Sequence, residues 1–367
     1  MSAGYSLLTG CNGVRPARRR LTMGGGHDQT TWTRFLHRHF LWLLIGTYAL
    51  ATQAPHPGLW VSQLATHLGI CGLEVRLSAP AGLLAFLLFT AGLAVKGSHL
   101  RDVLQRPAVL TFGLAASLLV PVVFLIVASP LFALWHDPTE VIDLVVGLAV
   151  VAAMPVAGSS AAWSRSADGD GALSLGLVLL STLLSPLTTP IALRAIGLFA
   201  PGGVGGELDR LAEAGGVGVF LAAWVVVPMA LGLFARWSIG GTRADAAGAW
   251  LKPTTSMALL VLCYANASTC LPGIVADPDW DFLALVVVAV VLMSGTVFVA
   301  GFGVAHAVRA DPARRAALVF GVGMANNGAG LSLASSALTA SPVALIPVVA
   351  INLIQHIVAG IASRRLA

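Results

Sequence analysis

The chain has 367 residues, of which 57% are hydrophobic and only 10% are charged, and its mean hydropathy is +0.86. This composition excludes a disordered protein and argues against a soluble globular domain. The formal net charge is +5, but the Lys and Arg residues are dispersed in short segments, which argues against nucleic acid as a partner. We expect most of the chain to lie in a lipid bilayer.

The first 32 residues lack an apolar core and carry a short basic run, with Arg15 followed by Arg18, Arg19 and Arg20. The first long apolar stretch begins only near Phe40, which is too far along the chain for a cleavable signal peptide. We therefore expect residues 1–32 to form a basic cytoplasmic tail.

Ten later stretches are apolar and long enough to span a bilayer, which takes about 20 mostly apolar residues in a helix. They predict an all-α polytopic membrane protein with ten transmembrane helices. The segment from His56 to Arg76, between the first two spans, is amphipathic at best and is expected at the outer surface. The predicted spans are 36–53, 80–97, 107–128, 142–164, 171–197, 216–236, 254–274, 281–306, 315–338 and 342–363.

The loops predict the orientation, because Lys and Arg concentrate on the cytoplasmic side of a membrane. With the N-terminus inside, most basic clusters fall on the inner side and the acidic segments around Asp137 and Asp279 fall outside. An even number of spans then also places the C-terminus inside. We expect a bacterial inner-membrane protein with both termini in the cytoplasm. Three basic residues do not follow this rule, namely Arg76, Arg194 and Arg210.

The ten spans divide into two sets of five, residues 33–198 and 216–367, joined by a connector at 199–215. Because five is odd, the second set is inserted upside down relative to the first, which predicts an inverted repeat. The alternative is a ten-helix bundle whose glycines only allow close packing.

The fourth and ninth spans are each interrupted by a run of small and polar residues, Met154–Ala162 and Gly321–Gly330. Non-helical backbone is tolerated at membrane depth only where it is buried in protein or lines a cavity. Broken helices at matching positions of two halves point to the substrate site of a secondary transporter. The helix ends exposed at such breaks attract anions at their N-termini and cations at their carbonyl ends.

Five residues are candidates for substrate binding: Gly158 and Ser159 in the first break, Asn326 and Asn327 in the second, and His356 in the last span. A single Ser can instead bond to its own helix. Two adjacent amides are costly in an apolar span unless they meet partners or solvent. His356 is either a partner in a helix–helix hydrogen bond or part of the solute pathway.

The four cysteines form no CxxC pair and have no companion His at metal-binding spacing, so we expect no metal site built on them. A disulfide between Cys71 and Cys270 remains an open alternative, since both are predicted near the outer side. There is also no nucleophile–base pair and no nucleotide-binding loop, so an enzyme is not expected.

Four motifs resemble those of the bile acid:sodium symporter family. Met154–Ala161 is similar to its Pro-Gly-Gly-Thr-Ala-Ser-Asn segment, and Ser181–Pro190 to its Ser-Thr-Leu-x-x-Pro-Leu-x-Thr-Pro run. Gly321–Asn326 resembles its Glu-Val-Gly-Met-Gln-Asn motif, and Gly92–Lys96 its Gly-Leu-x-Leu-Lys. The motifs occur in the family's order and cover most of the chain.

The resemblance implies ten helices in an inverted repeat, in which broken helices four and nine cross. It implies a panel domain made of spans one, two, six and seven, and a core domain made of the other six. It further implies uptake of organic anions with two sodium ions bound at the crossing. The sodium-site groups that this chain would retain are the side chains of Ser160 and Ser174 and the carbonyls of Val322 and Met324.

This chain departs from the family at five sodium ligands. Gly321 stands where the family has its sodium-binding carboxylate. A buried cation in a low dielectric needs a balancing negative charge, so we expect sodium coupling to be weakened or lost. The other four departures are Ala325, Ala161, Ala116 and Val178, which replace side chains with oxygen ligands.

The leading hypothesis is a secondary transporter of a small organic anion that needs no cofactor and no obligate protein partner. The alternative is a non-transporting membrane sensor or assembly subunit on the same scaffold, which would explain eroded ion sites. The adjacent amides of Asn326 and Asn327 argue against that alternative, because such a scaffold has no reason to retain them.

Overall fold

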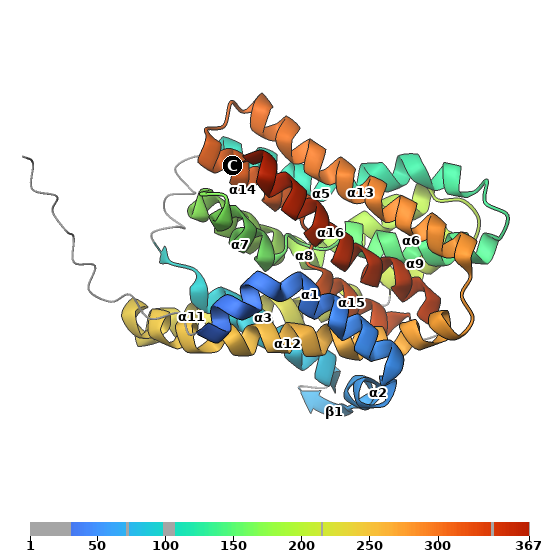
Figure 1. Ribbon diagram of the computed structural model, residues 1–367, viewed down its shortest axis with the longest axis horizontal. Coiled ribbons are helices and arrows are strands. Elements are labelled where there is room, and N and C mark those ends of the chain that lie inside the picture. Colours follow the sequence, from blue (N-terminus) through green and yellow to red (C-terminus); the bar gives the residue numbers. More distant parts are fainter. Residues whose placement is uncertain (1–30, 71–72, 98–106, 214–215, 339–340, 367) are drawn as a thin grey trace, which may run out of the picture.

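The computed structural model describes residues 31–70, 73–97, 107–213, 216–338 and 341–366. Within these ranges the protein is a bundle of long helices that lie side by side along one common direction (Figure 1). In the described part of the chain, six helical segments are long and apolar enough to cross a membrane, as expected for a polytopic membrane protein. They are Pro107–Phe132, Gly171–Phe199, Gly216–Ile239, Pro253–Ala276, Trp280–Ala307 and Pro342–Leu366.

The predicted fourth and ninth spans are each divided into two short helices. The fourth consists of α6 (Pro138–Ala152) and α7 (Gly158–Ser166), and the ninth of α14 (Pro312–Gly323) and α15 (Asn327–Ala337). None of the four reaches the roughly 20 residues that a spanning helix needs. The non-helical residues between the halves coincide with the two interrupted segments of the sequence.

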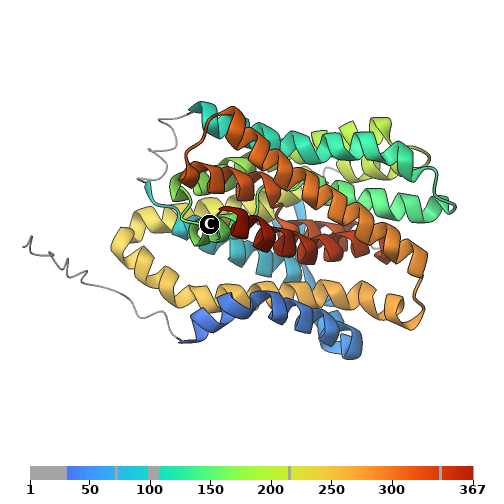
Figure 2. The same cartoon turned by 45° about the horizontal axis from the view of Figure 1, so that its top comes forward.

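Four segments pack together as one group, which we call the panel layer. It consists of α1 (Thr31–Gln53), α3 (Ala79–Ala94), the helix running through α10 (Gly216–Leu221), η1 (Ala222–Val226) and α11 (Val227–Ile239), and α12 (Gly241–Ala276). Figure 2 shows α1 and α12 side by side along one edge of the molecule. The layer contains the predicted spans one, two, six and seven.

The remaining long helices form a second group, which we call the core group. It surrounds the two broken helices and buries most of α6 and α14 on all sides. Its outer helix α13 (Trp280–Ala307) exposes a row of aliphatic side chains, including Val287, Val291 and Val299, as expected for a lipid-facing helix. The other members are α5 (Pro107–Phe132), α8 (Gly171–Phe199) and α16 (Leu345–Leu366).

The helix ends gather at two opposite sides of the bundle. At one side, Asp245 at the start of α12 pairs with Arg236 of α11 at 2.9 Å and with Lys96 after α3 at 3.7 Å. At the other side, His136 before α6 lies 3.4 Å from Asp281 at the start of α13. The acidic segments that the sequence placed on one side of the membrane therefore meet in the structure.

Two segments differ from the sequence expectations. Residues 56–76 were expected as an amphipathic surface segment, but they contain helix α2 (Pro55–Gln63) and most of an antiparallel hairpin of β1 (Ala65–Ile70) and β2 (Leu73–Ser78). The all-α class holds for the bundle, and this two-stranded hairpin is a local addition that the sequence did not predict. The connector at 199–215 contains a further helix, α9 (Val204–Glu213), which buries Val204 and Leu208 against α8 and α6. Its apolar residues recur every three to four positions and form one face, which packs against the bundle.

The disulfide left open between Cys71 and Cys270 has only one described partner. Cys270 is buried and carries a free thiol. Cys71 lies outside the described residues, as do residues 1–30 of the predicted basic tail.

Candidate functional site

The two breaks cross each other, and their backbones are joined directly. Val156 and Ala325 form an isolated antiparallel bridge. The N–H of Ala157 donates to the carbonyl of Met324 at 2.9 Å, and the N–H of Asn326 donates to the carbonyl of Pro155 at 2.8 Å. Each break thereby satisfies part of the other's unpaired backbone, which is a condition for irregular chain at membrane depth.

Side chains from α8 and α16 satisfy more of the broken backbone. Ser181 accepts a hydrogen bond from the N–H of Val156 at 3.0 Å, and Thr189 donates to the carbonyl of Ala153 at 2.7 Å. On the other break, the Gln355 amide donates to the carbonyl of Ala325 at 3.3 Å. No role was predicted for these three residues from the sequence, although Ser181 and Thr189 lie in the Ser181–Pro190 motif. The signal in the sequence was the density of hydroxyl side chains in that motif.

The helices that begin at the crossing present their N-termini there. Helix α7 begins at Gly158 without a side-chain cap, and Gly158 is exposed, with no heavy atom within 4 Å of the position a Cβ would take. Ser159 beside it is half-buried. The first N–H groups of an uncapped helix, together with its dipole, favour an anion. This end of the crossing can therefore receive a carboxylate.

The two adjacent amides have different environments. Asn326 is half-buried and caps α15, because its Oδ1 accepts from the N–H of Ala329 at 3.1 Å. Asn327 is 2% exposed, and neither of its amide atoms has a partner among the described residues. An unpaired buried amide costs roughly 1–3 kcal/mol, so Asn327 needs an explanation beyond packing.

His356 does not join the crossing loops. Its Nδ1 accepts from the indole N–H of Trp163 on α7 at 3.2 Å, and its ring lies edge-on to Phe40 of α1 at 5.5 Å. These contacts connect α16 to α7 and to the panel layer. They agree with the first of the two predicted roles of His356, that of a partner in a helix–helix hydrogen bond.

The retained sodium-site hydroxyls are already bonded within the protein. Ser160 donates to the carbonyl of Ala157 at 2.7 Å. The hydroxyl of Ser174 on α8 donates to the hydroxyl of Ser164 at 2.8 Å, and Ser164 lies one turn after Ser160 on α7. The two hydroxyls are thus engaged at successive turns of α7 and do not converge on one point.

The space that a side chain on residue 321 would take is filled. A Cβ built on Gly321 would lie 2.5 Å from Cδ1 of Leu177, and Leu177 is fully buried. Of the two carboxylates of α6, Asp143 is nearer to the break, and it lies nine residues before the helix end, or about 14 Å along the axis at 1.5 Å per residue. The described residues therefore do not fit a buried sodium ion that needs a carboxylate ligand at the crossing.

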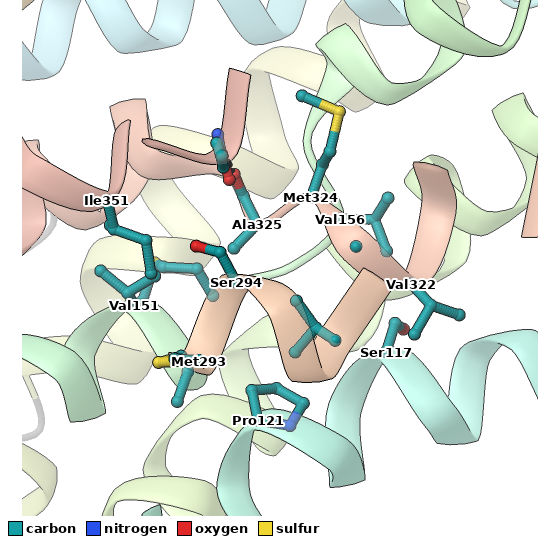
Figure 3. A pocket seen from close by; sticks show the side chains of 15 residues that line it. Ser117, Pro121, Val151, Val156, Met293, Ser294, Val322, Met324, Ala325 and Ile351 are labelled. Atoms are coloured by element: carbon teal, nitrogen blue, oxygen red, sulfur yellow. Dashed lines mark hydrogen bonds between the residues drawn. The ribbon is translucent and has the colours of Figure 1, made fainter. Parts of the chain in front are cut away.

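A small cavity of about 30 Å³ lies behind the crossing (Figure 3). Val322 and Met324 line it, whereas the carbonyl of Met324 is already engaged by the N–H of Ala157 at 2.9 Å. Ser117 and Ser294 add hydroxyl groups, and Ser294 has no hydrogen-bond partner among the described residues. A volume of this size holds about one water molecule, so the cavity is too small for an organic solute.

Comparison with known proteins gives three findings. Residues 81–276 match the model of the Sodium Bile acid symporter family. The chain is 26% identical over 281 residues to the uncharacterized protein YbaS of Bacillus subtilis, covering 76% of this chain and 85% of that protein. It is 25% identical over 268 residues to the uncharacterized sodium-dependent transporter YocS of Bacillus subtilis, covering 72% of this chain and 75% of that protein. The family match covers more than half of the chain and includes one complete broken helix, and from this we conclude that the protein belongs to the sodium bile acid symporter family of membrane transporters.

Proposed function

We propose that the protein is a secondary transporter that carries a small organic anion across the bacterial inner membrane by alternating access. The crossing of the two breaks carries this proposal, because it brings the uncapped N-terminus of α7 and the amide of Asn326 to one place. A carboxylate can bind the N–H groups of α7 without a basic side chain. The panel layer and the core group are the two bodies that would move relative to each other.

The same proposal includes the topology. The six long helices, the two broken helices, α1 and α3 give ten crossings, with the breaks in the fourth crossing of each half. Two halves of five crossings have opposite orientations in the membrane, which makes an inverted repeat. Both termini then lie in the cytoplasm, and residues 33–198 and 216–367 are the two repeats.

Sodium coupling is proposed to be weak or absent. The name of YocS describes a sodium-dependent transporter, but Leu177 fills the space beside Gly321 in this chain. The hydroxyls of Ser160 and Ser174 are engaged within the protein. A buried cation without a nearby negative charge is strongly disfavoured.

Uptake into proteoliposomes tests the function and the coupling together. A panel of radiolabelled carboxylates is offered with sodium, potassium or choline as the external cation. We expect uptake of at least one carboxylate, with a rate that changes less than about twofold when sodium is replaced. A tenfold sodium dependence, equal to about 1.4 kcal/mol of linkage, would show that sodium coupling is retained.

The site itself is tested with Asn326. Asn326→Leu removes the amide, and a hydrogen bond to a charged group contributes roughly 1.5–3 kcal/mol. Binding of a transported carboxylate should therefore weaken by roughly 10- to 150-fold. Because Asn326 also caps α15, Asn326→Ser serves as a second variant that keeps a capping oxygen. Ser336→Ala is the control, since its exposed hydroxyl donates to the carbonyl of Ser332 at 2.7 Å. Equal effects of Asn326→Leu and Ser336→Ala would remove the solute from the crossing.

A further inference from the structure

The panel helix α12 carries a buried amide with unmet hydrogen bonding. Asn266 is 0% exposed, its Nδ2 donates to the carbonyl of Leu262 at 2.9 Å, and its Oδ1 has no partner among the described residues. The bond to Leu262 fixes the orientation of the amide, so the free group is an acceptor. A buried acceptor without a partner is uncommon and costly.

The neighbours of Asn266 on α12 show which way it points. Leu262, four residues earlier, approaches α15, since its Cδ2 lies 3.5 Å from the position of a Cβ on Gly328. Cys263, three residues earlier, approaches α16, since its Sγ lies 3.4 Å from Nδ2 of Asn352. At about 100° per residue, Asn266 falls between these two directions. It therefore faces the junction of α12 with α15 and α16.

Asn327 on α15 lies on the same junction. Gly328 of α15 faces α12, whereas Gly330 faces α6 and α16, where Val150 and Val348 are its neighbours. By the same rotation per residue, Asn327 falls between the directions of these two glycines. It brings two unpaired amide atoms to the junction. Figure 1 shows α12 and α15 on adjoining sides of the boundary between the panel layer and the core group.

We propose that Asn266 and Asn327 together recognise a hydroxyl group of the transported anion. This inference rests on the proposed transport of an organic anion and defines the class of solute further. A hydroxyl can donate to Oδ1 of Asn266 while it accepts from Nδ2 of Asn327, which gives one unpaired group of each amide a partner at once. A carboxylate oxygen cannot do this, because it only accepts. The carboxylate and the hydroxyl of the solute would thus bind different groups.

Discrimination against anions that lack the hydroxyl follows from the same geometry. A site built to hydrogen-bond a substrate hydroxyl rejects the analogue without it, because the polar groups of the site are then left buried and unpaired. Asn266 belongs to the panel layer and Asn327 to the core group, so the solute would bridge the two bodies that alternating access moves apart.

The test uses the full-length protein in detergent and three matched pairs of acids that differ in their hydroxyl groups. The pairs are glycerate with propionate, 2-hydroxyisovalerate with isovalerate, and cholate with 5β-cholanate, and affinity is measured by titration. We expect the wild-type protein to bind the hydroxylated member of at least one pair at least about tenfold more tightly. Asn266→Leu should reduce this preference to less than about threefold, with the affinity for the deoxy member unchanged.

Two further variants separate recognition from folding. Asn266→Ser retains an acceptor and should keep part of the preference. Thr269→Val lies on the same helix, and its hydroxyl already donates to the carbonyl of Asn266 at 2.7 Å, so it should leave the preference intact. Without added acid, Asn266→Leu should melt no lower than Thr269→Val, because it removes an unpaired buried acceptor.

Three outcomes would overturn the inference. An unchanged hydroxyl preference in Asn266→Leu would show that Asn266 does not contact the solute. An equal loss of affinity for both members of a pair would assign Asn266 to the conformation of the protein and not to recognition. A wild-type protein that binds none of the six acids would contradict the proposed function, and this inference would fail with it.

Discussion

At the scale of single residues, Leu177 decides what position 321 can hold. Its Cδ1 would be 2.5 Å from a Cβ on residue 321, which is closer than real Cβ contacts occur. Leu177 is fully buried and packs with Leu173 and Leu318 in one apolar cluster. Introducing a carboxylate at 321 would therefore force the buried Leu177 side chain to move and would leave an unpaired buried charge.

The pair Gly321 and Leu177 should behave non-additively. Gly321→Glu should lower the melting temperature strongly, and Leu177→Ala alone should cost about 2–5 kcal/mol because it leaves a cavity. The double variant should lose less stability than the sum of the two single losses, since the smaller side chain at 177 makes room for the larger one at 321. Melting temperatures of the four proteins in one detergent measure this coupling. Additive effects would show that the two positions do not compete for space.

The sequence predicted the polar residues of the breaks better than it predicted their partners. Asn326 and Asn327 stand out because amides are rare and costly in apolar spans. Nothing local indicates that Ser181 or Gln355 completes the backbone hydrogen bonds of the crossing, because these contacts arise only when distant helices pack. The unpaired acceptor of Asn266 was missed for the same reason.

At the scale of elements, the panel layer depends on one close helix crossing. A Cβ on Gly92 of α3 would lie 2.1 Å from the carbonyl oxygen of Met229 on α11. A Cβ on Gly232 of α11 would lie 2.1 Å from the carbonyl oxygen of Phe89 on α3. The two glycines therefore let two backbones touch, which is how small residues bring membrane helices together.

Gly92→Ala should separate these two helices. Overpacking of this kind costs about 1–3 kcal/mol, and the neighbouring atom is backbone that cannot rotate away. Gly82→Ala on the same helix is the matched control, because no atom lies within 4 Å of its Cβ position. Ala is also the better helix former by roughly 0.5–1 kcal/mol, so the control should melt at the same temperature or higher. If Gly92→Ala and Gly82→Ala melted at the same temperature, the close crossing would not contribute to stability.

The long elements were predictable and the short ones were not. Apolar runs such as Trp280–Ala307 are unambiguous because a bilayer demands about 20 apolar residues. The β1–β2 hairpin and α9 were missed, since short segments outside the spans carry no comparable length requirement. Helix α9 forms because docking against α8 buries its apolar face, a tertiary effect that short periodicity alone does not establish.

At the scale of the whole molecule, the panel layer and the core group meet across a seam that contains polar side chains. Asn352 of α16 donates to the hydroxyl of Tyr48 on α1 at 2.8 Å, and Asn266 faces the same boundary from α12. Two bodies that must slide or rock tolerate polar contacts that can exchange partners with solute and water. The seam therefore fits a boundary that opens, whereas the purely apolar clusters inside the core group fit a rigid body.

The orientation of the molecule in the membrane can be tested at both ends. The structure places the turn with Asp137 and the start of α12 with Arg243 at opposite ends of the bundle (Figure 1). Because acidic residues gather at the first end and basic residues at the second, we expect Asp137 outside and Arg243 in the cytoplasm. The native cysteines are replaced by serine, and single cysteines are introduced as Asp137→Cys and Arg243→Cys.

A membrane-impermeant maleimide added to intact spheroplasts should label Asp137→Cys at once and Arg243→Cys only after permeabilisation. Asp137 caps α6 through the N–H of Thr139, so Thr139→Cys, which is exposed, provides a second outer position that leaves the cap in place. Leu144→Cys should stay unlabelled under both conditions, because Leu144 is fully buried. Labelling of Asp137→Cys and Arg243→Cys from the same side would contradict the proposed topology, since the number of crossings between them would then be even. If Arg243→Cys were labelled from outside and Asp137→Cys only after permeabilisation, the ten spans would stand. Both termini would then lie outside, against the distribution of Lys and Arg.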